Sequence, residues 1–329
     1  MSLFVPDDAD IADAVAALRR GELVGMPTET VYGLAGDARS DSAVRHIFSL
    51  KGRPADHPLI VHLADTDQLQ DWADHVPAKA LALAEAFWPG PMTLILAKAA
   101  GINKLVTGGQ DSIGIRIPQH PVALRLLRAF GDGIAAPSAN RFGHISPTTA
   151  QHVRDEFGGA LPCVLDGGAC AIGIESTIID LTGASVRILR PGQIGRDEII
   201  RIVGAVDEGG VASSPRVSGA LVSHYAPRTP TESVPRAQLI SRWKACQDEG
   251  ETAVVLSIGA APANLPGLAL PEQPEEFAHH LYAALRSLDA EGADRILVER
   301  TPEDRAWHAV ADRLLRASSA QDSRLESIG

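Results

Sequence analysis

Several features that would assign the chain to a common class of protein are scarce in this sequence. Only three cysteines occur, and no two of them form a CxxC pair: Cys163, Cys170 and Cys246. An odd number of separated cysteines argues against a disulfide framework, so we expect a reducing compartment. Aspartates stand near the N-terminus where a secretory signal carries Lys or Arg, and no apolar run approaches the roughly 18 residues of a membrane span. We expect a cytoplasmic protein without a membrane segment.

Positive charge is also in short supply. Lysine and arginine together number 30 against 41 aspartates and glutamates, which gives a formal net charge of -11. A protein that binds nucleic acid mainly through its phosphates needs a basic surface. We therefore expect no stable complex with nucleic acid, and instead a small anionic substrate held by a few well-placed cations.

The signature motifs of several enzyme classes are missing as well. The sequence has no GxxxxGK[ST] phosphate loop, so any ATP is not held as P-loop enzymes hold it. It has no HExxH sequence and no Cys/His set with zinc-ligand spacing, and we therefore name no metal ligand. A GxSxG nucleophile elbow is absent too.

The composition is that of a folded protein. The chain has 329 residues, of which 45% are hydrophobic and 22% charged, enough for one large domain or two ordinary ones. Apolar periodicity predicts helices and short strands that mix without strict alternation, which indicates an α/β domain with a mixed sheet. The expected helices are 8–20, 42–50, 78–88, 122–130 and 148–157, and the expected strands are 23–26, 59–63, 92–97, 113–117, 134–136, 163–165, 176–181 and 186–189.

The pattern changes after about Val203. Gly- and Ser-rich segments at 207–210 and 213–215 predict a linker. Beyond it, an alternation of helices and strands predicts a small Rossmann-like domain without a Gly-rich dinucleotide fingerprint, with helices at 236–246, 275–288 and 304–317 and strands at 253–257 and 295–298. We therefore divide the chain into a larger α/β domain at 1–205, a linker at 206–230 and a small α/β domain at 231–329.

A basic loop follows the helix expected at 42–50. It contains Lys51, Arg53 and His57, with Gly52 between the first two. Arginine offers a planar fork and lysine a mobile point charge, which together suit a phosphate chain. The competing interpretation is that these cations only complement the dipole at the end of the helix.

Residues 136–148 crowd hydroxyl and amide groups into a turn between a strand and a helix. Ser138, Asn140 and Ser146 lie in this segment. Hydroxyls and backbone N–H groups at such a sheet edge can bind phosphate or a nucleotide. The alternative is helix capping, with Ser146 as the N-cap and Pro147 at the first helical position.

Two more segments place polar side chains on strands. Alternation puts Ser112 and Arg116 on one side of the strand at 113–117, where an arginine at the strand end suits a carboxylate. The alternative is a surface ion pair. Ser176 begins the strand at 176–181, where it can simply favour β structure, and Arg190 follows the next strand.

Taken together and in this order, these segments resemble the YrdC-like family. The matching segments are PTETVYGL at 27–34, KGRPADHPL at 51–59, SIGIRIP at 112–118, APSANRFGHISPT at 136–148 and ESTIID at 175–180. Five ordered motifs spread over most of residues 7–200 are far more specific than any one of them. The sequence SHYAP at 223–227, followed by a small α/β domain, resembles the long two-domain form of the threonylcarbamoyl-AMP synthases of this family.

The resemblance implies a fold and a reaction. The fold is a twisted, open mixed sheet with helices and an electropositive active-site face, followed by a small Rossmann-like α/β domain. The reaction is that of an L-threonylcarbamoyladenylate synthase, a nucleotidyltransferase. L-Threonine, bicarbonate and ATP, assisted by Mg2+, give threonylcarbamoyl-AMP and pyrophosphate, and downstream transfer proteins use the product for threonylcarbamoyladenosine modification of tRNA.

The resemblance also implies roles for individual residues. Those expected at threonine are Thr30, His62, Arg116 and Ser176, with Arg116 at the carboxylate. Those expected at ATP are Arg53, His57, Ser112, Ser138, Asn140, Ser146, Arg190 and Tyr225. Lys51 and Arg53 are the candidates for catalytic charge, and the linker at 206–230 is expected to fold over the site as a lid.

Two other functions stay open at this point. One is a carbamoyl-adenylating carbamoyltransferase, although such proteins carry zinc-finger-like modules and this chain has no CxxC pair. The other is a module that binds double-stranded RNA or tRNA, which the acidic net charge disfavours.

Overall fold

A computed structural model describes residues 6–208, 214–219 and 225–318 of the chain. The chain divides into two compact units. The first comprises Met1–Phe142, Pro147–Ala171 and Glu175–Ala220, and the second comprises Gly143–Ser146, Ile172–Ile174 and Leu221–Gly329. Two short segments that precede the linker in sequence therefore belong with the C-terminal part.

The first unit is built on a mixed sheet that has ten strands among the described residues. In spatial order these are β10 (Val206–Glu208), β9 (Val186–Arg190), β8 (Thr177–Asp180), β4 (Met92–Ala97), β5 (Ser112–Arg116), β3 (Ile60–His62), β6 (Ile134–Ala135), β2 (Gly33–Asp37), β1 (Val24–Met26) and β7 (Cys163–Val164). The central strand β5 runs parallel to β3 and antiparallel to β4, and β4 in turn runs parallel to β8. This mixture places the ends of distant chain segments beside one another at the middle of the sheet.

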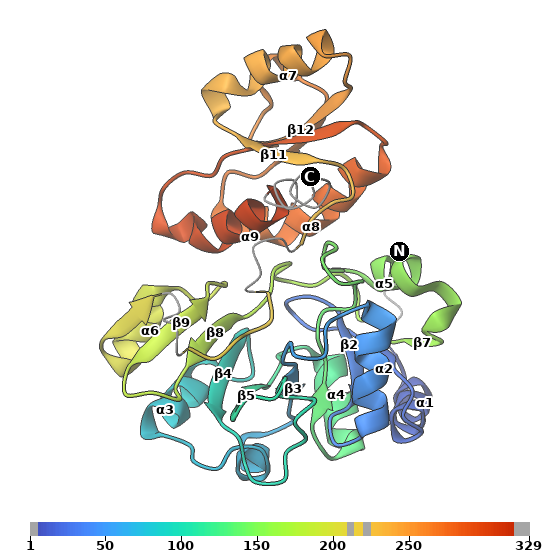
Figure 1. Cartoon of the computed structure of the whole chain (residues 1–329), viewed down its shortest axis with the longest axis vertical. Coiled ribbons are helices and arrows are strands. Elements are labelled where there is room, and N and C mark those ends of the chain that lie inside the picture. Colours follow the sequence, from blue (N-terminus) through green and yellow to red (C-terminus); the bar gives the residue numbers. More distant parts are fainter. Residues whose placement is uncertain (1–5, 209–213, 220–224, 319–329) are drawn as a thin grey trace. The chain divides into compact units, whose positions relative to one another are not determined.

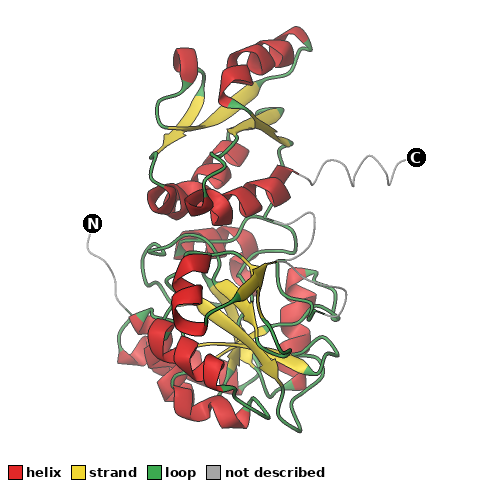
Figure 2. Ribbon diagram, turned by 90° about the vertical axis from the view of Figure 1, so that its left-hand side faces the viewer, coloured by secondary structure: helices red, strands yellow, loops and turns green. Residues whose placement is uncertain are grey.

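Helices pack around this sheet, as Figure 2 shows. They are α1 (Asp8–Arg19), α2 (Asp41–Lys51), α3 (Ala78–Phe87), α4 (Pro121–Phe130), α5 (Ala150–Phe157) and α6 (Arg196–Val203). Helix α2 ends at Gly52, whose positive φ of 65° suits glycine, and this turn sends the chain from Lys51 into the basic loop. The end of α2 thus fixes where the basic loop with Lys51 and Arg53 starts.

The two faces of the central strands differ in chemistry. Ile113 and Ile115 of β5 belong to the main hydrophobic core, with Leu94 and Leu96 of β4. Because side chains alternate along a strand, the other residues of β5 face the opposite side of the sheet. That second face carries the polar residues from which the site is built.

The second unit holds a parallel sheet in the order β11 (Thr231–Val234), β14 (Arg295–Glu299), β12 (Ala253–Ile258) and β13 (Gly267–Leu270). Helix α7 (Leu239–Asp248) covers one face, while α8 (Pro274–Ala290) and α9 (His308–Ser318) cover the other (Figure 1). Parallel strands joined through helices on both faces form a three-layer α/β arrangement. The predicted fold class, a mixed sheet with helices followed by a small α/β domain, is confirmed.

Most predicted elements lie within two residues of the observed ones, but several were missed. The missed elements are β2, β10, β11, β13 and α6. Strand β2 has the sequence GLAGD, which shows neither strict alternation nor β-branched residues. It becomes a strand because β1 and β6 pair with it from both sides.

Two local predictions are wrong. Asp207 and Glu208, assigned to the linker, lie in β10, which pairs with β9. Gly209, Gly210 and Ser213 of the predicted linker lie outside the described residues. The helix expected at Thr148 begins at Ala150 instead, with Thr149 rather than Ser146 as its N-cap. The carbonyl of Pro147 accepts a hydrogen bond of 2.9 Å from the N–H of Tyr32, which ties this residue to a neighbouring segment before the helix starts.

The C-terminal helices also start differently from the prediction. The helices predicted at 236–246 and 304–317 each begin with a short 3-10 turn, at Arg236–Gln238 and Arg305–Trp307, before α7 and α9.

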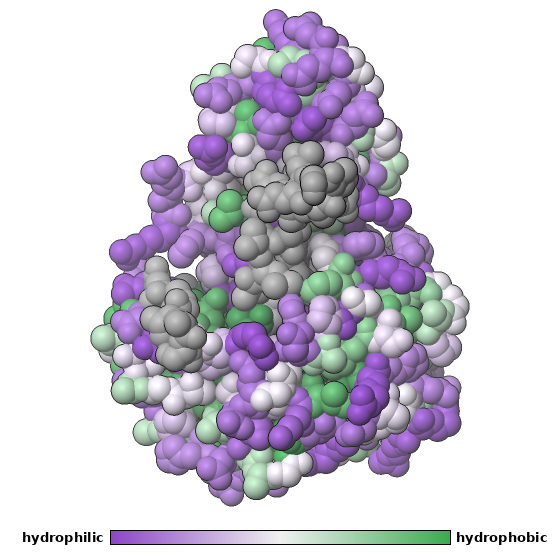
Figure 3. Space-filling model, in the orientation of Figure 1, coloured by the Kyte–Doolittle hydropathy of each residue, from purple (hydrophilic) through white to green (hydrophobic). Residues whose placement is uncertain are grey.

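No helix in the described part of the chain is long and apolar enough to cross a membrane. On the face shown in Figure 3, hydrophilic side chains predominate and hydrophobic ones are interspersed among them.

Candidate active site

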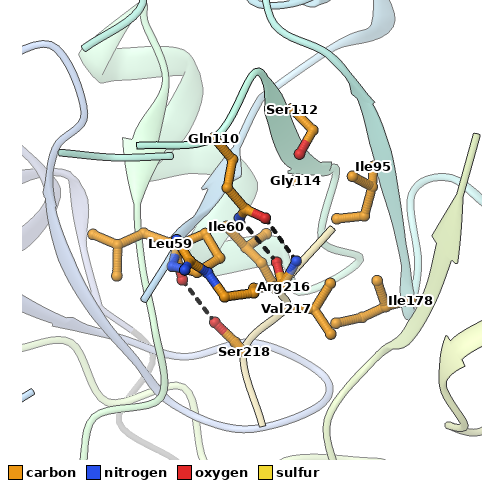
Figure 4. A pocket seen from close by; sticks show the side chains of 11 residues that line it. Leu59, Ile60, Ile95, Gln110, Ser112, Gly114, Ile178, Arg216, Val217 and Ser218 are labelled. Carbon is orange, nitrogen blue, oxygen red and sulfur yellow. Dashed lines mark hydrogen bonds between the residues drawn. The ribbon is translucent and has the colours of Figure 1, made fainter. Parts of the chain in front are cut away.

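A hollow lies on the polar face of the first unit's sheet (Figure 4). The space between its walls, open solvent included, is about 270 Å3. Its floor includes Ser112 and Gly114 of β5, Ile60 of β3, Ile95 of β4 and Ile178 of β8. A Cβ on Gly114 would lie 3.2 Å from Ile95 Cδ1, so a side chain there would crowd the floor. Small and apolar residues therefore keep the middle of the hollow open, and polar groups gather at its edges.

A short segment at 214–219, within the linker predicted at 206–230, covers the hollow. Arg216, Val217 and Ser218 line it from outside the sheet. The amide of Gln110 binds both backbone groups of Arg216: Oε1 accepts from the N–H at 2.6 Å, and Nε2 donates to the carbonyl at 3.1 Å. Val217 is 8% exposed and packs with Ile95 and Ile178. We call residues 214–219 the strap, because both hydrogen bonds and apolar contacts hold it across the hollow.

Two of the predicted ATP residues meet at the strap. Arg53 Nη2 donates to Ser218 Oγ at 3.0 Å and to the carbonyl of Pro58 at 2.9 Å. Arg190 Nη1 donates to the carbonyl of Ser218 at 2.9 Å. Both arginines are buried. Although they stand far apart in sequence, the fold thus brings two guanidinium groups to the same residue at the edge of the hollow.

Arg190 also connects this edge to Ser176, a predicted threonine residue. Its Nη2 donates to the carbonyl of Ser176 at 2.9 Å and to Ser176 Oγ at 3.1 Å. Ser176 Oγ is 2.7 Å from Thr93 Oγ1 on β4. The predicted ATP and threonine residues are therefore in direct contact at this point.

Arg116, at the end of β5, lies in a second polar cluster. Nη1 donates to Thr30 Oγ1 at 2.8 Å, and Nη2 lies 2.6 Å from Glu29 Oε1. The Arg116 and Glu29 side chains are only 5% and 6% exposed. Arg116 Nη2 and Glu29 Oε1 form an ion pair, but their geometry is not that of a hydrogen bond, and neither atom has another hydrogen-bond partner. Arg116 is thus not the surface ion pair of the alternative interpretation, but a buried cation with one poorly satisfied nitrogen.

His62 of β3 lies directly beside Arg116 in the register of the sheet. Burial and the neighbouring Arg116 charge lower the pKa of His62 to about 3. Its Nδ1 is buried and has no hydrogen-bond partner. The imidazole is therefore neutral near pH 7 and can offer a polar atom to a ligand.

Lys51 holds a loop rather than lining the hollow. Its buried Nζ donates to the carbonyls of Ser138, at 2.6 Å, and of Asn140. Burial, reinforced by the Arg53 charge, lowers the pKa of Lys51. Asn140 is also buried, and its Nδ2 donates to the carbonyl of Arg141 at 2.7 Å. A role for Lys51 only at the dipole of its own helix does not explain these hydrogen bonds to carbonyls of a distant loop.

The remaining predicted residues fall into two groups. Ser112 lines the hollow, and His57 stands against Phe142 with ring centroids 5.5 Å apart. Burial, and then Arg53, lower the pKa of His57. Ser146 and Tyr225 are buried in the second unit. Ser223 and His224, which carry part of the SHYAP resemblance, lie outside the described residues.

Sequence reasoning missed four residues that the structure places in these contacts: Glu29, Thr93, Gln110 and Ser218. Glu29 stands inside the PTETVYGL segment, directly before the predicted threonine residue Thr30, so its position in the motif could have indicated a place in the site. Thr93, Gln110 and Ser218 stand outside every recognised motif, and only tertiary contacts identify them.

Two family models match the chain. Residues 16–192 match the family described as "Telomere recombination", and residues 194–319 match the one described as "Threonylcarbamoyl-AMP synthase, C-terminal domain". Threonylcarbamoyl-AMP synthase of Pyrococcus abyssi is 40% identical over 319 residues, which cover 93% of each chain. That of Bacillus subtilis is 40% identical over 330 residues, with 96% of this chain and 94% of the relative covered.

A solved structure agrees with these relatives. The crystal structure of P. abyssi Sua5 complexed with L-threonine superposes with a TM-score of 0.89 at 39% identity, and the alignment covers 95% of each chain. Identity of this level over nearly the full length of both proteins shows common descent as well as a common fold. The chain belongs to the threonylcarbamoyl-AMP synthase family.

Proposed function

We propose that the chain joins L-threonine, bicarbonate and ATP to form threonylcarbamoyl-AMP and pyrophosphate, the activated intermediate for threonylcarbamoyladenosine modification of tRNA. The observation that carries this proposal is the convergence of Arg53, Arg190 and Ser176 at one edge of the hollow. A cluster of buried guanidinium groups suits a triphosphate, and a hydroxyl in contact with it suits the second substrate.

Threonine binds in this proposal at Thr30, His62, Arg116 and Ser176. The relative whose solved structure is described as complexed with L-threonine supports an amino acid site in a protein of the same fold. Arg116 meets the carboxylate, because its Nη2 is buried and lacks an aligned acceptor. The neutral His62 orients the substrate without adding charge beside Arg116.

ATP binds beside threonine, at the edge of the hollow where Arg53 and Arg190 meet Ser218. Arg53 and Arg190 bind the phosphates, and Ser112, Ser138, Asn140 and His57 contact the nucleotide within the first unit. Ser146 and Tyr225 are the predicted ATP residues of the second unit. Lys51 acts by holding the loop at 138–140 through its two carbonyl contacts. Arg53 is then the group that supplies positive charge where pyrophosphate leaves.

Mg2+ fits this arrangement as a companion of ATP. Over the described ranges of the chain, no three His, Cys, Asp or Glu side chains gather as ligands for a metal ion. Magnesium commonly keeps water and takes phosphate oxygens as ligands, which requires few protein groups. When bound, it would screen the phosphate charge, while the two arginines position the chain of phosphates.

The reaction needs positioning more than covalent help. The amine of threonine displaces water from bicarbonate to give a carbamate, and a carbamate oxygen then attacks the α-phosphate while pyrophosphate departs. Aligning these groups and stabilising the developing charge account for most of the acceleration in such transfers. Carbamates are labile in water, so the strap at 214–219 is well placed to serve as the lid that excludes solvent.

A single incubation tests the proposal. The purified chain is supplied with ATP, Mg2+, 14C-bicarbonate and one amino acid at a time, and pyrophosphate and labelled adenylate are measured. Threonine should give both products in equal amounts, and serine or valine should give far less. Carbamoyl phosphate in place of threonine and bicarbonate examines the carbamoyltransferase alternative. Pyrophosphate release with carbamoyl phosphate, or release that does not depend on threonine, would refute the proposal.

A further inference from the structure

Helix α8 of the second unit carries an unusual set of contacts along one side. His279, Tyr282 and Arg286 are spaced i, i+3 and i+7, so they form one stripe on the helix surface. We call these residues the α8 stripe. Within the same unit, the stripe meets three chain segments: the loop 172–174, Tyr225 and the loop 143–146.

The first contact is a close approach of two backbones. Gly173 has φ +84°, and a Cβ built there would lie 2.4 Å from the carbonyl oxygen of His279. Only glycine suits both the backbone conformation and the space. The loop 172–174 is therefore seated directly on the helix, immediately before Glu175 and the predicted threonine residue Ser176.

The second contact holds Tyr225. Its ring lies 5.8 Å from the ring of Tyr282, and the guanidinium of Arg313 lies 5.6 Å from its centre. Tyr225 is 1% exposed and Arg313 is fully buried. Tyr225 also has φ 62°, a left-handed conformation that a non-glycine residue keeps only when its surroundings impose it.

The third contact holds the loop 143–146. Arg286 donates from Nη2 to the carbonyl of Ile145. The N–H of Ala226, next to Tyr225, donates to the carbonyl of Gly143 at 2.9 Å. Ile145 and Ser146 are 3% and 0% exposed. This loop, which carries a predicted ATP residue, is thus fixed by α8 and by the residue after Tyr225.

We propose that Arg286 is a positioning residue for ATP, which acts through the carbonyl of Ile145 to place Ser146. Tyr282 has the same role for Tyr225. This inference rests on the proposed function and gives the C-terminal domain a part in it: α8 orders the segments that carry Ser146 and Tyr225. Arg286 itself does not touch the substrate.

Steady-state kinetics of Arg286→Ala in the full chain test the role. Loss of one charged hydrogen bond to the loop should raise KM for ATP roughly tenfold. KM for threonine should change less than about twofold, because the residues predicted to bind threonine lie in the first unit. Arg286→Lys retains a cation of similar length and should recover part of the ATP affinity. A residue that served only stability would shift Tm without this separation of the two KM values.

Arg242→Ala is the matched control. Arg242 belongs to α7 of the same unit and pairs with Glu232 and Glu249, away from the stripe. It should leave both KM values unchanged. An unchanged KM for ATP in Arg286→Ala, or equal rises in both KM values, would overturn the positioning role, and so would the same ATP effect in Arg242→Ala. If Arg286→Ala does not fold, Arg286→Met decides, because it nearly keeps the side-chain volume but has no donor for the carbonyl of Ile145, and a wild-type KM for ATP in it would overturn the role. Absence of product from the wild-type chain would instead refute the proposed function.

Discussion

The buried pair of Glu29 and Arg116 allows a quantitative test of the threonine site. The charged atoms are 2.6 Å apart, and the side chains are 6% and 5% exposed. Removing one partner leaves the other charge buried without compensation, which costs about 3–5 kcal/mol. Since folded domains are stable by only about 5–15 kcal/mol, Arg116→Ala should lose a large part of its free energy of unfolding. Urea unfolding followed by circular dichroism measures this loss.

The same substitution should weaken threonine binding. A hydrogen bond to a charged group contributes about 1.5–3 kcal/mol, which corresponds to roughly 10- to 150-fold in affinity. At saturating ATP, KM for threonine should rise by about that factor. KM for ATP at saturating threonine should change much less, because the proposed contact of Arg116 is with threonine alone.

A charge-free pair separates stability from binding. In Glu29→Gln/Arg116→Met both charges are gone and the side-chain volumes are nearly kept, so stability should return to within about 2 kcal/mol of wild type. KM for threonine should stay high in this variant. Arg128→Ala, at an exposed position of α4, is the control and should change stability by at most about 0.5 kcal/mol. A wild-type KM for threonine in the double variant, or a larger rise in KM for ATP, would refute the carboxylate contact.

Two further predictions concern pH and the strap. His62 has a pKa of about 3 in the folded chain against 6.5 ordinarily. Below pH 6.5 the unfolded chain therefore binds a proton that the folded chain does not. The stability that the neutral His62 contributes is therefore complete above pH 6.5. It decreases as the pH is lowered, and about 2 kcal/mol of it is lost at pH 5. Urea titrations should show that His62→Gln, but not the exposed His46→Gln, reduces this pH dependence; an unchanged dependence in His62→Gln would contradict a buried neutral imidazole. Gln110→Ala removes two hydrogen bonds to Arg216 and should loosen the strap by about 1–3 kcal/mol. Trypsin should then cut after Arg216 faster than in wild type or in the surface control Gln151→Ala, and an equal rate would show that Gln110 does not hold the strap.

Local patterns were sufficient for most elements of the fold. Alternation along Ser112–Arg116 correctly separated Ile113 and Ile115, which enter the core, from Ser112, which lines the hollow. Strand β2 escaped because GLAGD has no such alternation, and it exists only through pairing with β1 and β6. The start of α5 was misplaced because several hydroxyl residues in a row could cap it, and the tie between Pro147 and Tyr32 favours the later one.

The candidate site shows the same division. Ordered motifs predicted Arg53, Arg116 and Ser176 as members of one site, and the family resemblance added Arg190. They did not reveal that Glu29 pairs with Arg116, that Thr93 contacts Ser176, or that Ser218 receives Arg53 from 165 residues away. Thr93 and Ser218 lie outside the motifs, and Glu29 lies inside one beside the predicted Thr30. The residue types of these three partners therefore did not predict the contacts.

The amino-acid pattern was enough to establish the family, the mixed sheet and the polar side of its central strand, because strand alternation and motif order are properties of neighbouring residues. Tertiary structure alone decided which residues contact each other at the hollow and that the loops 143–146 and 172–174 belong with the C-terminal unit. The physical reason is that strand order and loop docking depend on the burial and pairing of groups far apart along the chain. Local periodicity does not record such contacts.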